Sequence, residues 1–185
     1  MTTVDSLKNH FLIAMPGMAD ERFTQSVTYI CEHNAGGAMG LVINQPSEMS
    51  YSELFKHLKL NDDYPDNSPL LAGGPVQKER GFVLHTRDKS WESTLPVSDD
   101  IAITGSKDIL ADIANHEGPQ SVLIALGYAG WSAGQLESEL GQNSWLTVPA
   151  TKQIIFDLPL EERWQCSAKA LGIDLHLMTS DAGHA

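Results

Sequence analysis

Polar residues that could perform acid–base chemistry stand at the ends of predicted strands. A histidine titrates near neutral pH, and a carboxylate beside it can orient its ring or exchange a proton with it. Strand ends can meet at one rim of a sheet, where such side chains could form the site of an otherwise unrecognised enzyme or of a small-ligand-binding protein. The candidates for this rim are Glu32, His33, Asn44 and His85.

Two of these candidates also have a simpler structural explanation. Glu32 lies close to Gly36, and Asn44 lies close to Pro46, so both stand beside sequences typical of turns. Side chains at such positions commonly satisfy backbone groups through hydrogen bonds. We favour this interpretation, and the acid–base hypothesis stays open beside it.

A second polar group lies on a predicted helix. The helix is expected to begin at Ser132, because Ser132 and Gln135 have the spacing of a capping box. Gln135 and Glu139 are four residues apart and therefore share one face, with Asn143 at the end of the helix. This stripe either faces a ligand or forms a solvated helix edge that Asn143 terminates, and the sequence leaves both alternatives open.

The sequence contains none of the common motifs for cofactor or metal chemistry. Residues 36–40 are rich in glycine but do not match G-x-G-x-x-G, and the chain has no Walker loop, G-x-S-x-G elbow or H-E-x-x-H pair. Its 7 histidines lack the close spacings of metal ligands, and Cys31 and Cys166 stand far apart outside any CxxC pattern. We therefore expect no cofactor, no bound metal and two unpaired, unreactive thiols.

The length and composition of the chain indicate a single globular domain. A chain of 185 residues with 42% hydrophobic residues can bury one core, so a single domain over residues 1–185 is expected.

The net charge of −12 repels phosphate backbones and anionic lipids. Between Lys89 and Lys152 the chain has one base, Lys107, and 8 acids. The segment that comes nearest to a basic patch is residues 78–89, and it also contains acids. We expect no direct binding to duplex DNA and no membrane association.

Targeting and membrane segments are not recognisable in the sequence. Residues 1–8 lack the basic and then apolar order of a signal peptide. No apolar run approaches the roughly 20 residues of a transmembrane helix. A cytoplasmic location with reduced thiols is therefore expected.

The order of predicted elements favours an α+β fold. Strands occur in pairs with single helices between them, unlike the regular strand–helix alternation of a doubly wound parallel sheet. The expected domain therefore has a mixed, mostly antiparallel sheet with about three to four helices. Strands are predicted at residues 10–15, 25–31, 38–43, 69–72, 81–85, 100–104, 121–126 and 153–156, of which 25–31 and 38–43 form a hairpin. Helices are predicted near Ser50, Ser106, Ser132 and Pro159, with Ser50 and Ser106 as N-caps. The last helix places Leu160, Trp164, Ala168 and Leu171 on one apolar face.

The most distinctive segment of the chain is residues 127–146. Gly127 and Gly130 are predicted to reverse the chain after the strand at 121–126, because glycine tolerates conformations in which a Cβ would clash. Trp145 follows the predicted helix and is expected to be substantially buried.

Several motifs in this order resemble the bacterial YqgE/AlgH family. The central segment contains GYAGW, GQLE and NSWL, and the resemblance extends over essentially the whole chain. It implies a compact mixed α/β fold, a cytosolic bacterial setting and a role described as transcriptional regulation, without an agreed biochemical activity. The other matching motifs are FLIAMP at 11–16, CEH at 31–33, GAMGLVIN at 37–44, GGPVQ at 73–77, GFVLH at 81–85 and GHA at 183–185.

Three classes of function are compatible with these observations. The first is a regulator that acts through a protein partner or a small ligand, which the family resemblance favours. The second is an enzyme or ligand-binding protein that uses the rim of Glu32, His33, Asn44 and His85. The third is a plain interaction module, and the sequence leaves the partner, the ligand and the oligomeric state open.

Overall fold

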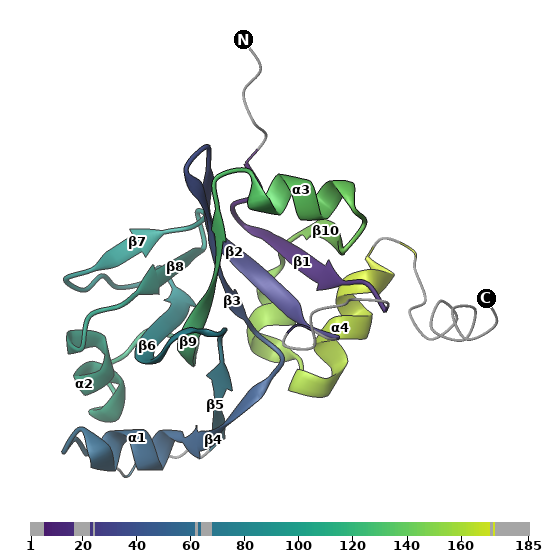
Figure 1. Ribbon diagram of the computed structural model, residues 1–185. Coiled ribbons are helices and arrows are strands. Elements are labelled where there is room, and N and C mark those ends of the chain that lie inside the picture. Colours follow the sequence, from purple (N-terminus) through teal and green to yellow (C-terminus); the bar gives the residue numbers. More distant parts are fainter. Residues whose placement is uncertain are drawn as a thin grey trace.

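The computed structural model describes residues 6–16, 23, 25–61, 63, 68–170 and 172. This part of the chain forms one twisted sheet flanked by short helices (Figure 1). The elements are β1 (His10–Ala14), β2 (Val27–Asn34), β3 (Gly37–Val42), β4 (Pro46–Ser50), α1 (Tyr51–His57), β5 (Pro69–Ala72), β6 (Val76–Thr86), β7 (Thr94–Pro96), β8 (Ile101–Thr104), α2 (Asp108–Ala114), β9 (Val122–Ser132), α3 (Gln135–Gly141), β10 (Trp145–Pro149), the π-helix η2 (Gln153–Asp157) and α4 (Leu160–Lys169).

The sheet is mixed and mostly antiparallel, as the sequence predicts. Its main path runs β10-β1-β2-β3-β9-β6-β8-β7, and β4 and β5 lie off this path. Among the described strands only β5 and β9 pair in parallel. Strands β2 and β3 form the predicted hairpin, and β9 joins it to the half of the sheet that contains β6 and β8.

Helices cover both faces of the sheet, and three apolar clusters fill the space between the layers. The largest cluster joins Val148 of β10 and Ile103 of β8, strands near opposite ends of the path, so the sheet curls around it. Trp164 and Ala168 of α4 close this cluster, as the apolar face of the predicted last helix requires. A second cluster lies beneath α1 and α2, and a third contains Leu136 of α3.

The helix starts show which of the predicted caps form. Ser50 accepts a hydrogen bond from the backbone N–H of Glu53 and caps α1, as predicted. Ser106 does not cap α2: its hydroxyl donates to the carboxylate of Asp108 at 2.5 Å, and α2 begins at that aspartate. The oxygen of Ser106 accepts instead from the backbone N–H of Ser93, a residue outside the helix, at 3.2 Å.

The predicted start of α3 at Ser132 is also wrong. Strand β9 continues through Ser132, and α3 begins at Gln135 after the left-handed Gly134. Half of the capping box nevertheless forms, because the Gln135 amide oxygen accepts from the backbone N–H of Ser132 at 3.0 Å. The Ser132 hydroxyl donates to the same oxygen instead of capping the helix.

Two further expectations need correction. Gly127 has a φ of 77°, but neither it nor Gly130 reverses the chain, because both lie inside β9 and pairing with β6 and β3 keeps that strand extended. Residues 153–156 form π-helical turns instead of a strand. The adjacent residues Ile154 and Ile155 are both buried, which a strand with one buried face would not allow.

The described residues contain four α-helices and one π-helix, slightly more helical segments than predicted. Strands β4, β7 and β10 are also additional to the predicted strands. The apolar face expected for the last helix includes Leu171, which lies outside the described residues, as does the C-terminal tail. Within the described part of the chain, no helix has the length and apolar composition needed to cross a bilayer.

Candidate functional site

His33, a candidate for acid–base chemistry, is bonded through both ring nitrogens. The backbone N–H of Leu7 donates to Nδ1 at 2.8 Å, so Nδ1 carries no hydrogen. Nε2 therefore carries the hydrogen and donates it to Oε1 of Glu137 at 2.5 Å. This bond lowers the pKa of Glu137 and ties α3 to β2. The adjacent candidate Glu32 is exposed and lines a small hollow of about 160 Å³.

Asn44 satisfies backbone groups, as the turn interpretation expects, but these groups lie at the start of β2 and not in the turn near Pro46. Its side-chain oxygen accepts from the backbone N–H of Val27 at 2.9 Å. Its amide nitrogen donates to the backbone oxygen of Gln25 at 2.8 Å. Asn44 thus joins the end of β3 to the start of β2.

His85 is fully buried and belongs to a closed chain of hydrogen bonds. Its Nδ1 donates to the backbone oxygen of Thr86 at 2.7 Å, so Nε2 accepts from the hydroxyl of Thr104 at 2.7 Å. Thr104 in turn accepts from the hydroxyl of Thr94, which accepts from the backbone N–H of Trp91. Burial lowers the pKa of His85, so the neutral ring of this network is favoured.

The strand register separates His85 from His33. His85 pairs with Val122 near the start of β9, whereas Ala38, the partner of His33, pairs with Trp131 near its end. Nine residues of a strand extend over roughly 30 Å. The structure therefore does not bring the four rim candidates together, and their role in catalysis or binding stays a prediction.

The polar stripe on α3 fastens this helix to the sheet. Oε1 of Glu139 accepts from the indole N–H groups of Trp131 at 3.0 Å and Trp145 at 2.9 Å. The amide nitrogen of Gln135 donates to the other oxygen of Glu139 at 2.9 Å. Asn143 has a φ of 59° just beyond the helix, which is the conformation of a helix terminator. Contact between this stripe and a ligand stays a prediction.

Both cysteines are free thiols. Cys31 is buried in β2, and its burial raises the pKa of the thiol. Cys166 of α4 is half-buried. Among the described residues, no three His, Cys, Asp or Glu side chains lie close enough together to hold a metal ion.

A bulge in β6 separates two hollows of the described surface. Val76 pairs with Tyr128 and Gly81 pairs with Leu126, so the four β6 residues between them oppose a single residue of β9. The extra residues 77–80 are exposed and stand away from the sheet. Hollows open on both sides of this bulged segment. Sequence reasoning identified Lys78 and Arg80 only as the nearest approach to a basic patch, because register is not visible in the sequence.

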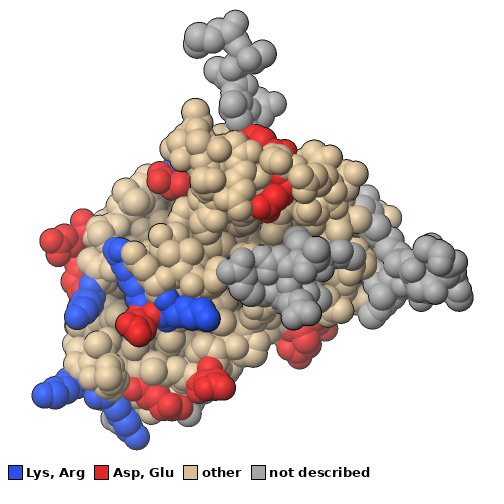
Figure 2. All heavy atoms as spheres, in the orientation of Figure 1, with Lys and Arg blue, Asp and Glu red and all other residues tan. Residues whose placement is uncertain are grey.

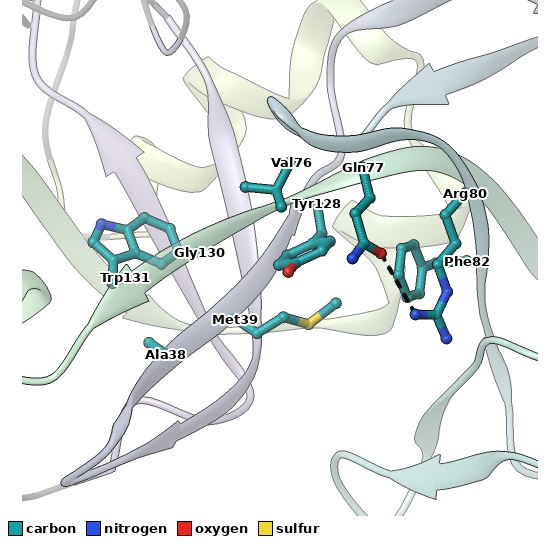
Figure 3. Close-up of a pocket in the computed structure, with 9 residues that line it drawn as sticks. All are labelled: Ala38, Met39, Val76, Gln77, Arg80, Phe82, Tyr128, Gly130 and Trp131. Carbon is teal, nitrogen blue, oxygen red and sulfur yellow. Dashed lines mark hydrogen bonds between the residues drawn. The ribbon is translucent and has the colours of Figure 1, made fainter.

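The hollow on one side of the bulge is shallow and partly aromatic (Figure 3). Phe82 and Tyr128 meet edge to face with ring centroids 5.7 Å apart. The guanidinium of Arg80 lies 5.0 Å from the centre of the Phe82 ring and donates to Gln77 at 3.5 Å. Figure 3 shows Met39 beside the Tyr128 ring, whereas the indole of Trp131 lies apart at the far end. This hollow is wide open to solvent and has few groups that could hold a small molecule.

The hollow on the other side of the bulge is more enclosed, and we call it the α1–α2 groove. It has a volume of about 560 Å³. Its apolar floor and walls come from β4, β6, β9 and both helices, and cationic side chains stand at its rim. It is lined by Met49, Leu54, His57, Leu58, Lys78, Glu79, Arg80, Gly81, Val83, Gly105, Ser106, Lys107, Leu110 and Leu126.

The cations of the α1–α2 groove are not neutralised. Lys78, Arg80 and Lys107 are exposed and have no carboxylate partner among the described residues. Glu79 is the one acid in the lining. Figure 2 shows Lys and Arg side chains gathered over the side of the molecule where β6, β8 and α1 lie in Figure 1. On a chain with a net charge of −12, these side chains form a local concentration of positive charge.

The fold and the groove define a class: an α+β protein with a curled sheet and a groove beside two short helices. The chain belongs to the AlgH-like family (DUF179), whose sequence profile matches residues 11–176. It is 56% identical over 181 residues to a UPF0301 protein of Saccharophagus degradans, covering 97% of this chain and 89% of the relative. It is 53% identical to a UPF0301 protein of Thioalkalivibrio sulfidiphilus over the full length of both chains.

Two solved structures share the fold. The solution structure of the AlgH protein from Pseudomonas aeruginosa is 51% identical with a TM-score of 0.82, over 100% of this chain and 99% of that one. The crystal structure of protein DIP2367 from Corynebacterium diphtheriae has a TM-score of 0.73 over 97% of this chain and 94% of that one. Because the two sequences are only 18% identical, this match shows a common fold alone. The family expected from the sequence motifs is thus confirmed.

Proposed function

We propose that this protein is a cytoplasmic regulator that acts through a bound small ligand or a protein partner and not by contacting duplex DNA. The observation that carries the proposal is the α1–α2 groove. It combines an apolar lining with unpaired cations on an otherwise acidic chain.

The dimensions and lining of the groove suit a small molecule. Its volume of about 560 Å³ falls in the range of ligand sites, which is on the order of 300–1,000 Å³. Such sites usually combine a mostly apolar wall with a few polar groups that fix the orientation of the ligand. Here the floor residues Val83 and Leu126 provide the wall, and Lys78 and Lys107 provide the polar groups.

The same cations are poorly arranged for duplex DNA. Strong DNA binding uses on the order of 6–10 phosphate contacts from Lys and Arg. The lining of the groove provides Lys78, Arg80 and Lys107 and would bring Glu79 to the phosphates with them. Helices α1 and α2 are each only 7 residues long, and neither presents a row of basic residues.

The enzyme alternative receives no support from the geometry. Hydrogen bonds inside the protein occupy both ring nitrogens of His33 and of His85. A general base must reach the proton that it removes from a substrate. Neither ring has a free nitrogen for this step.

Substitution of Gly81 by leucine tests the proposed role of the groove. Gly81 lies two residues before Val83 and therefore faces the same side of β6, and a Cβ built on it meets no heavy atom within 4 Å. Gly81→Leu should fill the groove and leave the fold intact. Lys152→Gln, an exposed change outside the groove, is the control.

The readout is the transcript profile of strains that carry each variant on the chromosome. We expect the Gly81→Leu strain to match a strain lacking the protein and the Lys152→Gln strain to match the parent. Equal protein levels, measured by immunoblot, exclude loss through degradation. A parental profile in the Gly81→Leu strain would contradict the proposal.

A further inference from the structure

We propose that the α1–α2 groove binds a single-chain amphipathic anion, which has an aliphatic tail and a terminal carboxylate or phosphate. This inference rests on the proposed function in one respect: both take the α1–α2 groove as the ligand site. It does not depend on what the bound protein regulates.

The aliphatic tail is inferred from the kind of apolar side chain in the groove. Met49, Leu54, Leu58, Leu110 and Leu126 are all flexible or branched aliphatic residues. The lining contains no Phe, Tyr or Trp, so a nucleobase or another flat aromatic ring would have no stacking partner there. Aliphatic walls contact an alkyl chain well, and each buried CH₂ group contributes about 0.8 kcal/mol.

The anionic head is inferred from the rim. Lys78 extends from the bulged part of β6, and Lys107 precedes α2 across the groove. Arg80 also lines the groove, although its guanidinium lies over the Phe82 ring. The described residues offer none of them a carboxylate partner, so a ligand would provide their counter-ion without breaking an existing ion pair. Glu79 stands among these cations and opposes more highly charged ligands such as nucleoside triphosphates.

Gly81 explains why the groove is open at this point. It lies in the floor between Arg80 at the rim and Val83 deeper in the sheet. Any larger residue at this position would project into the groove, because the space around its Cβ is empty to at least 4 Å. The head and the tail of one ligand can therefore occupy the rim and the floor simultaneously.

Calorimetric titration of the full-length protein with four probes below their micelle concentrations tests the ligand class. The probes are decanoate, decyl phosphate, acetate and decyltrimethylammonium. We expect decanoate or decyl phosphate to bind with a dissociation constant at least tenfold below those of acetate and the cation. The stronger of the two binders distinguishes a carboxylate from a phosphate head.

Three variants locate the binding. Lys78→Gln/Lys107→Gln should weaken binding of the preferred anion at least tenfold, and Gly81→Leu should abolish it. The charge-matched control Lys152→Gln/Lys169→Gln removes two exposed lysines outside the groove and should bind like the parent. Thermal melting of each variant checks that it is folded.

Several outcomes would overturn the inference. These are binding of neither long-chain anion, equal binding of the cationic probe, or parental affinity in folded Lys78→Gln/Lys107→Gln or Gly81→Leu. If the anions fail to bind while the Gly81→Leu strain still loses its transcript response, the ligand class is wrong and the proposed function stands. If the anions bind while that strain keeps the parental profile, the inference stands and the proposed function is wrong.

Discussion

Glu139 is the residue on which the attachment of α3 most depends. One of its oxygens accepts from the indoles of Trp131 and Trp145, which are only 7% and 4% exposed. Glu139→Ala leaves two buried donors without an acceptor, and each unsatisfied group costs about 1–3 kcal/mol. We therefore expect a loss of about 2–5 kcal/mol in the free energy of unfolding, measured by urea denaturation. Glu139→Gln keeps an acceptor oxygen and should lose clearly less, and equal losses would contradict the role assigned to the carboxylate.

Trp145, one of the two indole donors to Glu139, also packs against other aromatic rings. It lies against Phe23 and Trp131 with ring centroids 5.6 Å and 6.2 Å away. Trp145→Ala removes these contacts and leaves a cavity, which should cost about 3–5 kcal/mol. A thermal or urea transition like that of the parent would show that this indole is not part of the core.

The bond between His33 and Glu137 predicts a pH dependence of stability. The hydrogen bond from His33 lowers the pKa of Glu137 below its ordinary value of 4.5. The carboxylate therefore stabilises the fold above pH 4.5, and this contribution disappears as the pH falls through the lowered pKa. Because the Glu137 side chain is 39% exposed, solvent screening limits the effect to about 0.2–1 kcal/mol. Urea titrations from pH 3 to pH 7 should show less acid destabilisation in Glu137→Gln than in the parent, and parallel curves would sink the prediction.

At the scale of elements, two glycines with similar backbone angles should differ in their tolerance of a side chain. Gly127 in β9 has a φ of 77°, and a Cβ there would lie 2.5 Å from the backbone oxygen of Gly74. Gly134 before α3 has a φ of 78°, and a Cβ there meets nothing within 4 Å. Gly134→Ala should cost about 1–2 kcal/mol for the left-handed backbone alone, and Gly127→Ala should cost more. Comparable urea midpoints for the two variants would show that the close approach at β9 is not rigid.

The elements that the sequence predicts well are those with local causes. Ser50 and Glu53 form a cap between neighbours on the chain, and the apolar spacing of Ile109, Leu110 and Ile113 gives the buried face of α2. The prediction for Ser106 failed because its oxygen accepts from the backbone N–H of Ser93, which is 13 residues away, instead of from a helix N–H.

Other elements depend on partners that are distant in the sequence. The extension of β9 through Ser132 requires its pairing with Gly37 of β3. Short strand β7 forms because β8 provides a pairing edge. Propensity gives no information about such partners, so the sequence predicted the sheet type correctly and several strand boundaries incorrectly.

At the scale of the whole molecule, the candidate site could not be predicted from the sequence. The rim hypothesis assumed that strand ends such as His33 and His85 meet, whereas the order of strands keeps them roughly 30 Å apart along β9. The α1–α2 groove joins residues from 49 to 126, and its shape depends on a register shift opposite Gly127. The sequence identified the segment with Lys78 and Arg80 as the nearest approach to a basic patch, but it did not identify the apolar residues that form the floor of the groove.

The central claim is that any regulatory role of this protein acts through the groove and does not involve direct contact with duplex DNA. Fluorescence anisotropy of mixed genomic fragments, titrated with the full-length protein at about 150 mM salt, tests this claim most directly; at that ionic strength exposed charges are screened beyond about 8 Å. With a net charge of −12 and three rim cations, we predict no binding at micromolar protein concentrations. Sub-micromolar binding that weakens steeply with added salt would contradict the claim and would establish direct control of transcription.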